Sequence, residues 1–191
     1  MKQILEQREK LQALRSSLRD DSALIQFTVN MPGANKTIYP SYELASLGIN
    51  TIIKDLYIYN IEIKNMMFHN STLGMIGLFK INEDPYLLKR LCIEIECENI
   101  LSKYWDIDVF NESGRKISRK MLQLSPRKCF ICEKTAKECA FIQAHPIEKL
   151  LQQVVLDFQH FKCMNEDCYS LLSNPILCNG GYENEKYITN R

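Results

Sequence analysis

The amino-acid sequence predicts an α+β fold: one domain with a mixed sheet flanked by helices. Windows with 3.6-residue periodicity occur along the chain together with windows of alternating or continuous apolar residues, so both helices and strands are expected. The two kinds do not alternate strictly, which argues against a βαβ repeat. The 191 residues, 46% of them hydrophobic, are enough for one well-filled core.

Four segments have a helical pattern: 2–18, 41–56, 83–91 and 146–161. The first is charged and amphipathic. Ser41 is a candidate N-cap of the second helix, in which Gly48 is a weak point because glycine has low helix propensity. Pro85 stands in the first turn of the third helix, where its missing N–H does no harm.

The strand candidates are 23–30, 56–63, 74–81, 92–98, 105–110 and 115–118. In 92–98, CIEIECE, acidic and apolar residues alternate, which predicts Glu94 and Glu96 on the same side of a strand. A hairpin with Gly114 at positive φ is expected to join the last two strands. The single domain (1–191) is predicted to have its core at about 2–161, a Cys/His-rich segment at 129–145 and a loose tail at 174–191.

The segment YWDIDVF, 104–110, places two acids on one face of a predicted strand. Aspartate is a poor strand former, so the presence of Asp106 and Asp108 in one strand suggests that they have a functional role. Their oxygens suit Mg²⁺, which usually takes one or two carboxylates together with substrate phosphates. The pair is therefore a candidate site for metal-assisted phosphoryl or nucleotidyl transfer. The alternative is a half-exposed strand with a solvated acidic face.

Residues 115–128, RKISRKMLQLSPRK, are basic and contain no acid. The cations are Arg115, Lys116, Arg119, Lys120, Arg127 and Lys128. A basic return strand beside an acidic strand is suited to a polyphosphate substrate, with the metal on one side and guanidinium groups on the other. A solvated basic sheet edge is the alternative.

Four potential zinc ligands follow at short spacing: Cys129, Cys132, Cys139 and His145. The Cys-x-x-Cys half is a good knuckle signal, so a structural Zn²⁺ is a candidate cofactor. Partly buried cysteines without metal are the alternative. A thioredoxin-like redox pair lacks the βαβ context that it needs.

The charge balance excludes some classes of function. The formal net charge is +1, which gives no global electrostatic case for binding nucleic acid or a membrane. The N-terminus is charged and lacks the apolar run of a signal peptide, and no apolar run is long enough to span a bilayer. We therefore expect a cytoplasmic protein with reduced cysteines.

These motifs resemble the apo-citrate lyase phosphoribosyl-dephospho-CoA transferases, also called holo-citrate lyase synthases. The family has W-D-x-D-V followed by R-x-C-x₂-C-x₆-C-x₅-H, and WDIDV (105–109), SR (118–119) and PRKCFIC…C…H (126–145) match it. Weaker likeness lies in FTVNMPGANK (27–36), and the resemblance covers roughly residues 6–160. In NILSK (99–103) the chain departs from the family's H-P-L-G-R.

The resemblance implies a nucleotidyltransferase-like fold and a nucleotidyl-type transfer. The donor is triphosphoribosyl-dephospho-CoA and the acceptor is a serine hydroxyl on the acyl carrier protein subunit of citrate lyase. A phosphodiester forms and pyrophosphate leaves. Carrier proteins are generally acidic, so we expect the basic segment 115–128 to face either the carrier or the donor.

The resemblance also implies roles for individual residues. Asp106 and Asp108 hold Mg²⁺, and Glu94 or Glu96 supplies a further ligand or the base for the serine. The residues implied in donor binding are Arg8, Gln12, Lys36, Arg119 and Arg127. Those in the first helix would close over the donor, and the other three would neutralise its polyphosphate.

Two other functions stay open on the sequence. The malonate decarboxylase phosphoribosyl-dephospho-CoA transferases run the same chemistry on a different carrier protein, although no comparable Cys-rich block is expected in them. A non-catalytic zinc module that binds protein or nucleic acid is the second alternative, and the near-neutral charge of the chain argues against nucleic acid. A thiol oxidoreductase is a distant third, because it needs a low-pKa thiol at Cys129 or Cys132.

Overall fold

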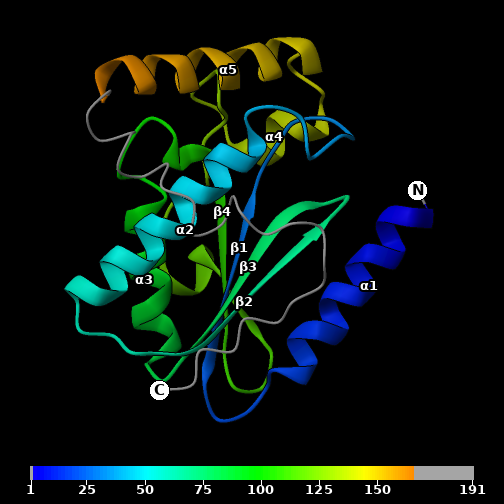
Figure 1. Cartoon of the computed structure of the whole chain (residues 1–191). Helices are drawn as coiled ribbons and strands as arrows, with labels where there is room; N and C mark the ends of the chain where they lie inside the picture. The colour runs from blue at the N-terminus through cyan, green and yellow to red at the C-terminus, as the bar shows by residue number, and fades with distance from the viewer. Residues whose placement is uncertain (1, 166–191) are drawn as a thin grey trace.

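The computed structural model describes residues 2–165 and confirms an α+β fold (Figure 1). In chain order its main elements are α1 Lys2–Ser17, β1 Ala23–Val29, α2 Ser41–Ile58, β2 Ile63–Ser71, β3 Gly74–Ile81, α3 Pro85–Ile95, β4 Trp105–Phe110, β5 Lys116–Ile117, α4 Ala136–Phe141 and α5 Ile147–Met164. Two 3₁₀ turns, Ser102–Tyr104 and Arg119–Leu122, precede β4 and follow β5. The predicted tail at 174–191 lies outside the described residues.

The sheet has five strands in the order β2-β3-β1-β4-β5, and every neighbouring pair is antiparallel. The prediction of a mixed sheet is therefore wrong. The reason lies in the β2–β3 hairpin. Helix α2 returns the chain so that β2 runs in the same direction as β1, but the hairpin places β3 between them and no parallel pair forms.

The sheet separates two apolar clusters of unequal size. Alternate residues of β1, including Ile25 and Phe27, face a large core formed with α2, α3 and α5. The intervening Leu24 faces a small cluster under α1 that also contains Leu11 and Ile76. Figure 1 shows this division, with α2 and α3 on one side of the sheet and α1 on the other. The α1 side is thinly packed, which leaves room for polar side chains.

Gly48 has a different role from the one predicted. A Cβ atom there would lie 2.5 Å from the ring of Phe27 and 2.9 Å from that of Trp105, so glycine allows α2 to approach the sheet closely. The predicted N-cap is also corrected. Ser41 is the first helical residue and Pro40 occupies the cap position, with no side-chain hydrogen bond.

The predicted strands at 92–98 and 56–63 are wrong. Residues 85–95 form one helix, α3, and residues 56–58 complete α2. The alternation in CIEIECE overlaps a helical stripe, because Leu88, Leu91, Cys92 and Ile95 are all buried on one side of α3. The N-terminus of α3 is fixed by the Asp84 carboxylate, which accepts from two backbone N–H groups. Because the helix buries this apolar stripe, residues 92–95 form a helix and not a strand.

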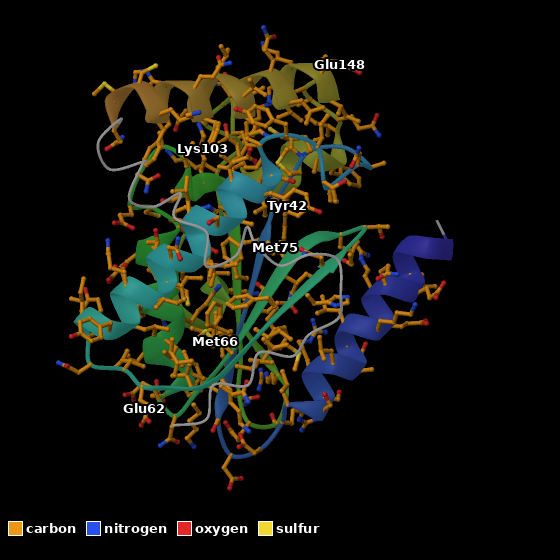
Figure 2. The ribbon with its side chains drawn as sticks, in the orientation of Figure 1. Tyr42, Glu62, Met66, Met75, Lys103 and Glu148 are labelled. Carbon is orange, nitrogen blue, oxygen red and sulfur yellow. The ribbon has the colours of Figure 1, made fainter. Side chains whose placement is uncertain are left out.

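Helix α5 crosses one end of the sheet (Figures 1 and 2). A buried carboxylate, that of Asp157, holds it there. Asp157 accepts a hydrogen bond from the Tyr104 hydroxyl at 2.5 Å and forms an ion pair with the Lys103 ammonium at 2.7 Å. Lys103, labelled in Figure 2 below α5, stands in the NILSK departure, so its charge serves the packing of α5. None of the helices between residues 2 and 165 is long and apolar enough to cross a membrane.

Replacing Asp157 by leucine is expected to lower the free energy of unfolding by roughly 2–3 kcal/mol, because the Tyr104 hydroxyl and the Lys103 ammonium lose their acceptor. Urea unfolding followed by circular dichroism measures this loss. The matched control is His160→Leu, an exposed position on the same helix. Equal stability of the two variants would show that Asp157 does not anchor α5.

Candidate active site

Strand β4 presents its two aspartates on one face, as the sequence predicts, and this face is on the α1 side of the sheet. Trp105, Ile107 and Val109 are buried in the large core, and the residues between them are half-buried. In the register with β1, Asp106 pairs with Thr28 and Asp108 with Gln26. The two carboxylates, called the Asp pair below, thus stand next to each other on the thinly packed face.

The outer edge of β4 is completed by side chains. Strand β5 pairs only with Val109 and Phe110, so the backbone groups of Ile107 have no strand partner on that side. The Ile107 N–H donates to Glu96 Oε1 at 2.9 Å, and the Lys89 ammonium donates to the Ile107 carbonyl at 2.5 Å. Buried backbone groups need such partners. Helix α3 and its C-cap residue Glu96 therefore hold the residue between the two aspartates through side-chain hydrogen bonds.

Two arginines neutralise Glu96, whose side chain is only 2% exposed. Arg119 contacts one oxygen at 2.5 Å and Arg127 the other at 2.6 Å. Arg127 also donates to the Trp105 carbonyl and lies 3.2 Å from the Asp106 carboxylate. Arg127 thus links the buried Glu96 to the exposed end of the Asp pair.

The predicted alignment of Glu94 with Glu96 does not occur, because the segment is helical. Glu94 is exposed and lines a separate pocket with Tyr59 and Leu87, on the opposite side of the sheet from the Asp pair. Of the two glutamates, only Glu96 is brought to β4.

The electrostatics of the Asp pair are set by burial, by the mutual repulsion of the two carboxylates and by two neighbouring cations. Partial burial raises the pKa of Asp106 above the ordinary aspartate value, and the charge of Asp108 raises it further, while Arg127 and Lys116 act in the opposite sense. Lys116 makes a 2.6 Å ion pair with Asp108. Two neighbouring carboxylates whose repulsion is only partly compensated fit the ligand preference of Mg²⁺.

Arg8 and Lys36 lie close enough to interact. Burial lowers the pKa of Lys36, and the positive charge of Arg8 lowers it further. The Lys36 ammonium donates to the Met31 carbonyl. The Lys36 carbonyl lies beside Gly74, near the end of the sheet where Thr28 and Asp106 pair. Two adjacent cations at this end suit an anionic group.

Gln12, the other predicted donor-binding residue of α1, lines a pocket of about 300 Å³ between α1 and the ends of β1 and β4. This cavity is called the α1 pocket below.

The four predicted zinc ligands come together. One ligand atom from each of Cys129, Cys132, Cys139 and His145 lies within 4.8 Å of the others, and both Cys139 Sγ and His145 Nε2 lie 3.4 Å from Cys132 Sγ. A tetrahedral zinc with Zn–S bonds near 2.3 Å needs ligands roughly 3.8 Å apart. These four residues, called the Cys-His centre below, therefore fit a structural Zn²⁺.

The local fold of the segment helps to place these ligands. A capping box in which Thr135 and Glu138 satisfy each other's backbone N–H groups starts α4, which contains Cys139. Burial opposes ionisation of the Cys129 thiol, but the backbone N–H groups of Ile131 and Cys132 point at its sulfur, and the net effect lowers its pKa. A stabilised thiolate is what zinc requires.

Three residues of this region were not among the predicted site residues. Lys89 lies within LLKRL, where the pattern predicts an exposed lysine on a helix face. No sequence signal indicates that it is buried. Arg15 of α1 donates to Gln26 at 2.6 Å and lies over the Phe110 ring. Lys116 belongs to the recognised basic segment, but its pairing with Asp108 depends on the β4–β5 register.

Partly buried carboxylates with a perturbed pKa, framed by cations, mark this face of the sheet as a candidate active site. The family model described as apo-citrate lyase phosphoribosyl-dephospho-CoA transferase matches residues 1–160. The chain belongs to this family, and it is therefore an enzyme, a transferase.

Individual relatives agree with the family match. A protein of Citrobacter koseri with the same name as the family is 28% identical over 151 residues, which cover 78% of this chain and 82% of the relative. One of Escherichia coli O9:H4, again with that name, is 30% identical over 131 residues, 69% of this chain and 72% of the relative. Protein CitXG of Haemophilus influenzae is 40% identical over 81 residues, which make up 17% of its length.

The Cys-His centre leads to a prediction about metal content. The purified wild-type protein is expected to contain about one zinc per chain, and Cys132→Ser close to none, because a tetrahedral structural site needs all four ligands. Elemental analysis by mass spectrometry measures the ratio. Cys97→Ser, which removes an exposed cysteine outside the centre, should keep its zinc. A zinc-free wild type would contradict the assignment.

Proposed function

We propose that this enzyme transfers the phosphoribosyl-dephospho-CoA group from triphosphoribosyl-dephospho-CoA to a serine hydroxyl on the acyl carrier protein subunit of citrate lyase. The family match and the relatives' names support this acceptor and this group. The observation that carries the chemistry is the Asp pair on one face of β4, facing a cation-lined side of the sheet. We also propose that the antiparallel sheet and its helices form a nucleotidyltransferase-like fold.

The reaction is a displacement at phosphorus. The serine oxygen forms a bond to the α-phosphorus of the donor's triphosphate, and the bond from that phosphorus to the bridging oxygen breaks. Pyrophosphate leaves with the electron pair, and the serine proton passes to a base or to water. Bound to Asp106 and Asp108, Mg²⁺ supplies charge neutralisation at the phosphate oxygens. The chain's own work is to orient the triphosphate and compensate its charge.

We assign the cations to two tasks. Arg8 and Lys36 lie at the Asp106 end of the sheet and bind the leaving end of the triphosphate. Arg127 lies 3.2 Å from Asp106 and can also reach a phosphate held there, because guanidinium groups donate to several acceptors at once. Arg119 contacts Glu96 and acts through it as a positioning residue.

Neither glutamate is proposed as the base. Glu96 accepts from Ile107, Arg119 and Arg127, so its oxygens are occupied and its role is to position β4. Glu94 lies on the other side of the sheet.

Docking of an acidic carrier protein is proposed on the β4–β5 side of the molecule. Arg115 and Lys120 are exposed there, and neither makes an ion pair within residues 2–165. Exposed charges of this kind raise association rates with a partner of opposite charge. The other cations of the basic segment are engaged with carboxylates, so they contribute less to docking.

The decisive test is the intact mass of apo-citrate lyase carrier subunit after incubation with the enzyme, the donor and Mg²⁺. Wild type is expected to add the mass of one phosphoribosyl-dephospho-CoA group, and Asp106→Asn/Asp108→Asn to lose at least 100-fold in rate, since metal ligation is removed. Full activity of the double variant would favour a non-catalytic role for the Asp pair. If only the malonate decarboxylase carrier protein is modified, the proposed acceptor is wrong and that carrier is the acceptor.

The acid limb of the pH–rate profile provides a second test. The Asp pair must be ionised to hold a cation, so activity falls as pH falls through the raised pKa of Asp106. Lys116 lowers that pKa, and Lys116→Gln is therefore expected to move the acid limb of kcat/KM to higher pH. Lys10→Gln removes an exposed cation of α1 that pairs with Glu6, away from the Asp pair and the proposed docking surface, and is the control. An equal shift in both variants would contradict the role of Lys116.

A further inference from the structure

The α1 pocket has a polar lining with an apolar floor. Its polar side chains are Gln12, Arg15, Ser16, Arg19, Ser22 and Asn111. Leu24 and Phe110, neighbours across the β1–β4 pair, form the floor. At about 300 Å³ it reaches the lower end of the size range of small-molecule sites.

Two guanidinium groups give the pocket a positive charge. Arg15 lies 4.7 Å above the Phe110 ring and donates to Gln26, and burial lowers its pKa. Arg19 lies against Gly114, where a Cβ atom would come within 3.3 Å of the guanidinium carbon. Neither arginine has a carboxylate within 4.0 Å among the residues that the structure describes, and no acid lines the pocket. Such a pair suits a phosphate or diphosphate group.

The pocket lies on the same face of the sheet as the Asp pair. Phe110 follows Asp108 by two residues on β4, which corresponds to roughly 7 Å along a strand. The charge of Asp108 is felt at Arg15. Along this face the cations Arg8 and Lys36 lie toward the Asp106 end, and the α1 pocket lies beyond Asp108.

We propose that the α1 pocket binds the diphosphate ester of the donor's dephospho-CoA part, with Arg15 and Arg19 as its ligands. This inference rests on the proposed function, because that function supplies a donor with two separate phosphate clusters. The triphosphate reacts at the Asp pair. The diphosphate that joins the adenosine to the pantetheine arm lies in the pocket, with the apolar floor beneath the neighbouring organic groups.

Calorimetric titration of the whole protein with dephospho-CoA tests the proposal without any turnover. Arg19→Gln and Arg15→Gln are each expected to weaken binding roughly tenfold, the effect of losing one charge-assisted hydrogen bond. Arg19→Lys should keep part of the affinity. Lys10→Gln is the matched control, because Lys10 is an exposed cation of α1 paired with Glu6, away from the pocket. Thermal melting confirms that each variant is folded.

Two further probes separate the sources of phosphate. Pantetheine, which lacks phosphate, should bind wild type and Arg19→Gln equally weakly. Inorganic pyrophosphate should lose less affinity than dephospho-CoA in Arg19→Gln, because it also has the Asp106 end of the sheet available. If pyrophosphate binding alone depends on Arg19, the pocket serves the leaving group and the donor assignment is overturned. Unchanged dephospho-CoA binding in folded Arg15→Gln and Arg19→Gln overturns the proposal as well.

The carrier-modification assay distinguishes this proposal from the proposed function. If wild type modifies no carrier but dephospho-CoA binding still depends on Arg15 and Arg19, the function fails and the diphosphate pocket stands. If wild type modifies the carrier and Arg19→Gln does so with an unchanged KM for the donor, the pocket proposal fails and the function stands.

Discussion

The outer edge of β4 at Ile107 is the point on which the site depends. An edge strand that is buried must find partners for its N–H and C=O groups, and β5 is too short to reach this residue. Glu96 and Lys89 of the α3 segment take the place of the missing strand. Because Ile107 lies between Asp106 and Asp108, these two side chains set the position of both carboxylates.

The same constraint connects the Cys-His centre to the Asp pair. Burying Glu96 is costly unless its charge is paired, and Arg119 and Arg127 supply the pairing. Arg127 is anchored by the fold of the Cys-His centre, since its carbonyl accepts from the Ala136 N–H at the start of α4. A metal that fixes this centre therefore fixes the arginine that lies 3.2 Å from Asp106. A structural zinc bound there would thus act on the proposed site only indirectly, through the position of Arg127.

Local patterns predicted the parts of the site that depend on spacing alone. Period-two alternation placed Asp106 and Asp108 on one strand face, and the Cys-x-x-Cys spacing anticipated a four-ligand cluster. The sequence around Glu96 fits both a strand and a helix, and only burial of the α3 stripe against the sheet decides between them. The partners of Lys89 and Arg119 are distant in sequence, and the edge that they complete exists only once β4 has paired with β1.

The cations on the α1 face of the sheet form two groups, one on each side of the Asp pair. A chain with net charge +1 has no general excess of cations, yet this face places cations at both ends of the Asp pair. Arg8 and Lys36 lie at one end and Arg15 and Arg19 at the other, with Lys116 and Arg127 bound to the aspartates between them. A single phosphate would need only one such group of cations. Two groups separated by a carboxylate pair fit the proposed donor, whose phosphates form two clusters on either side of the proposed reacting centre.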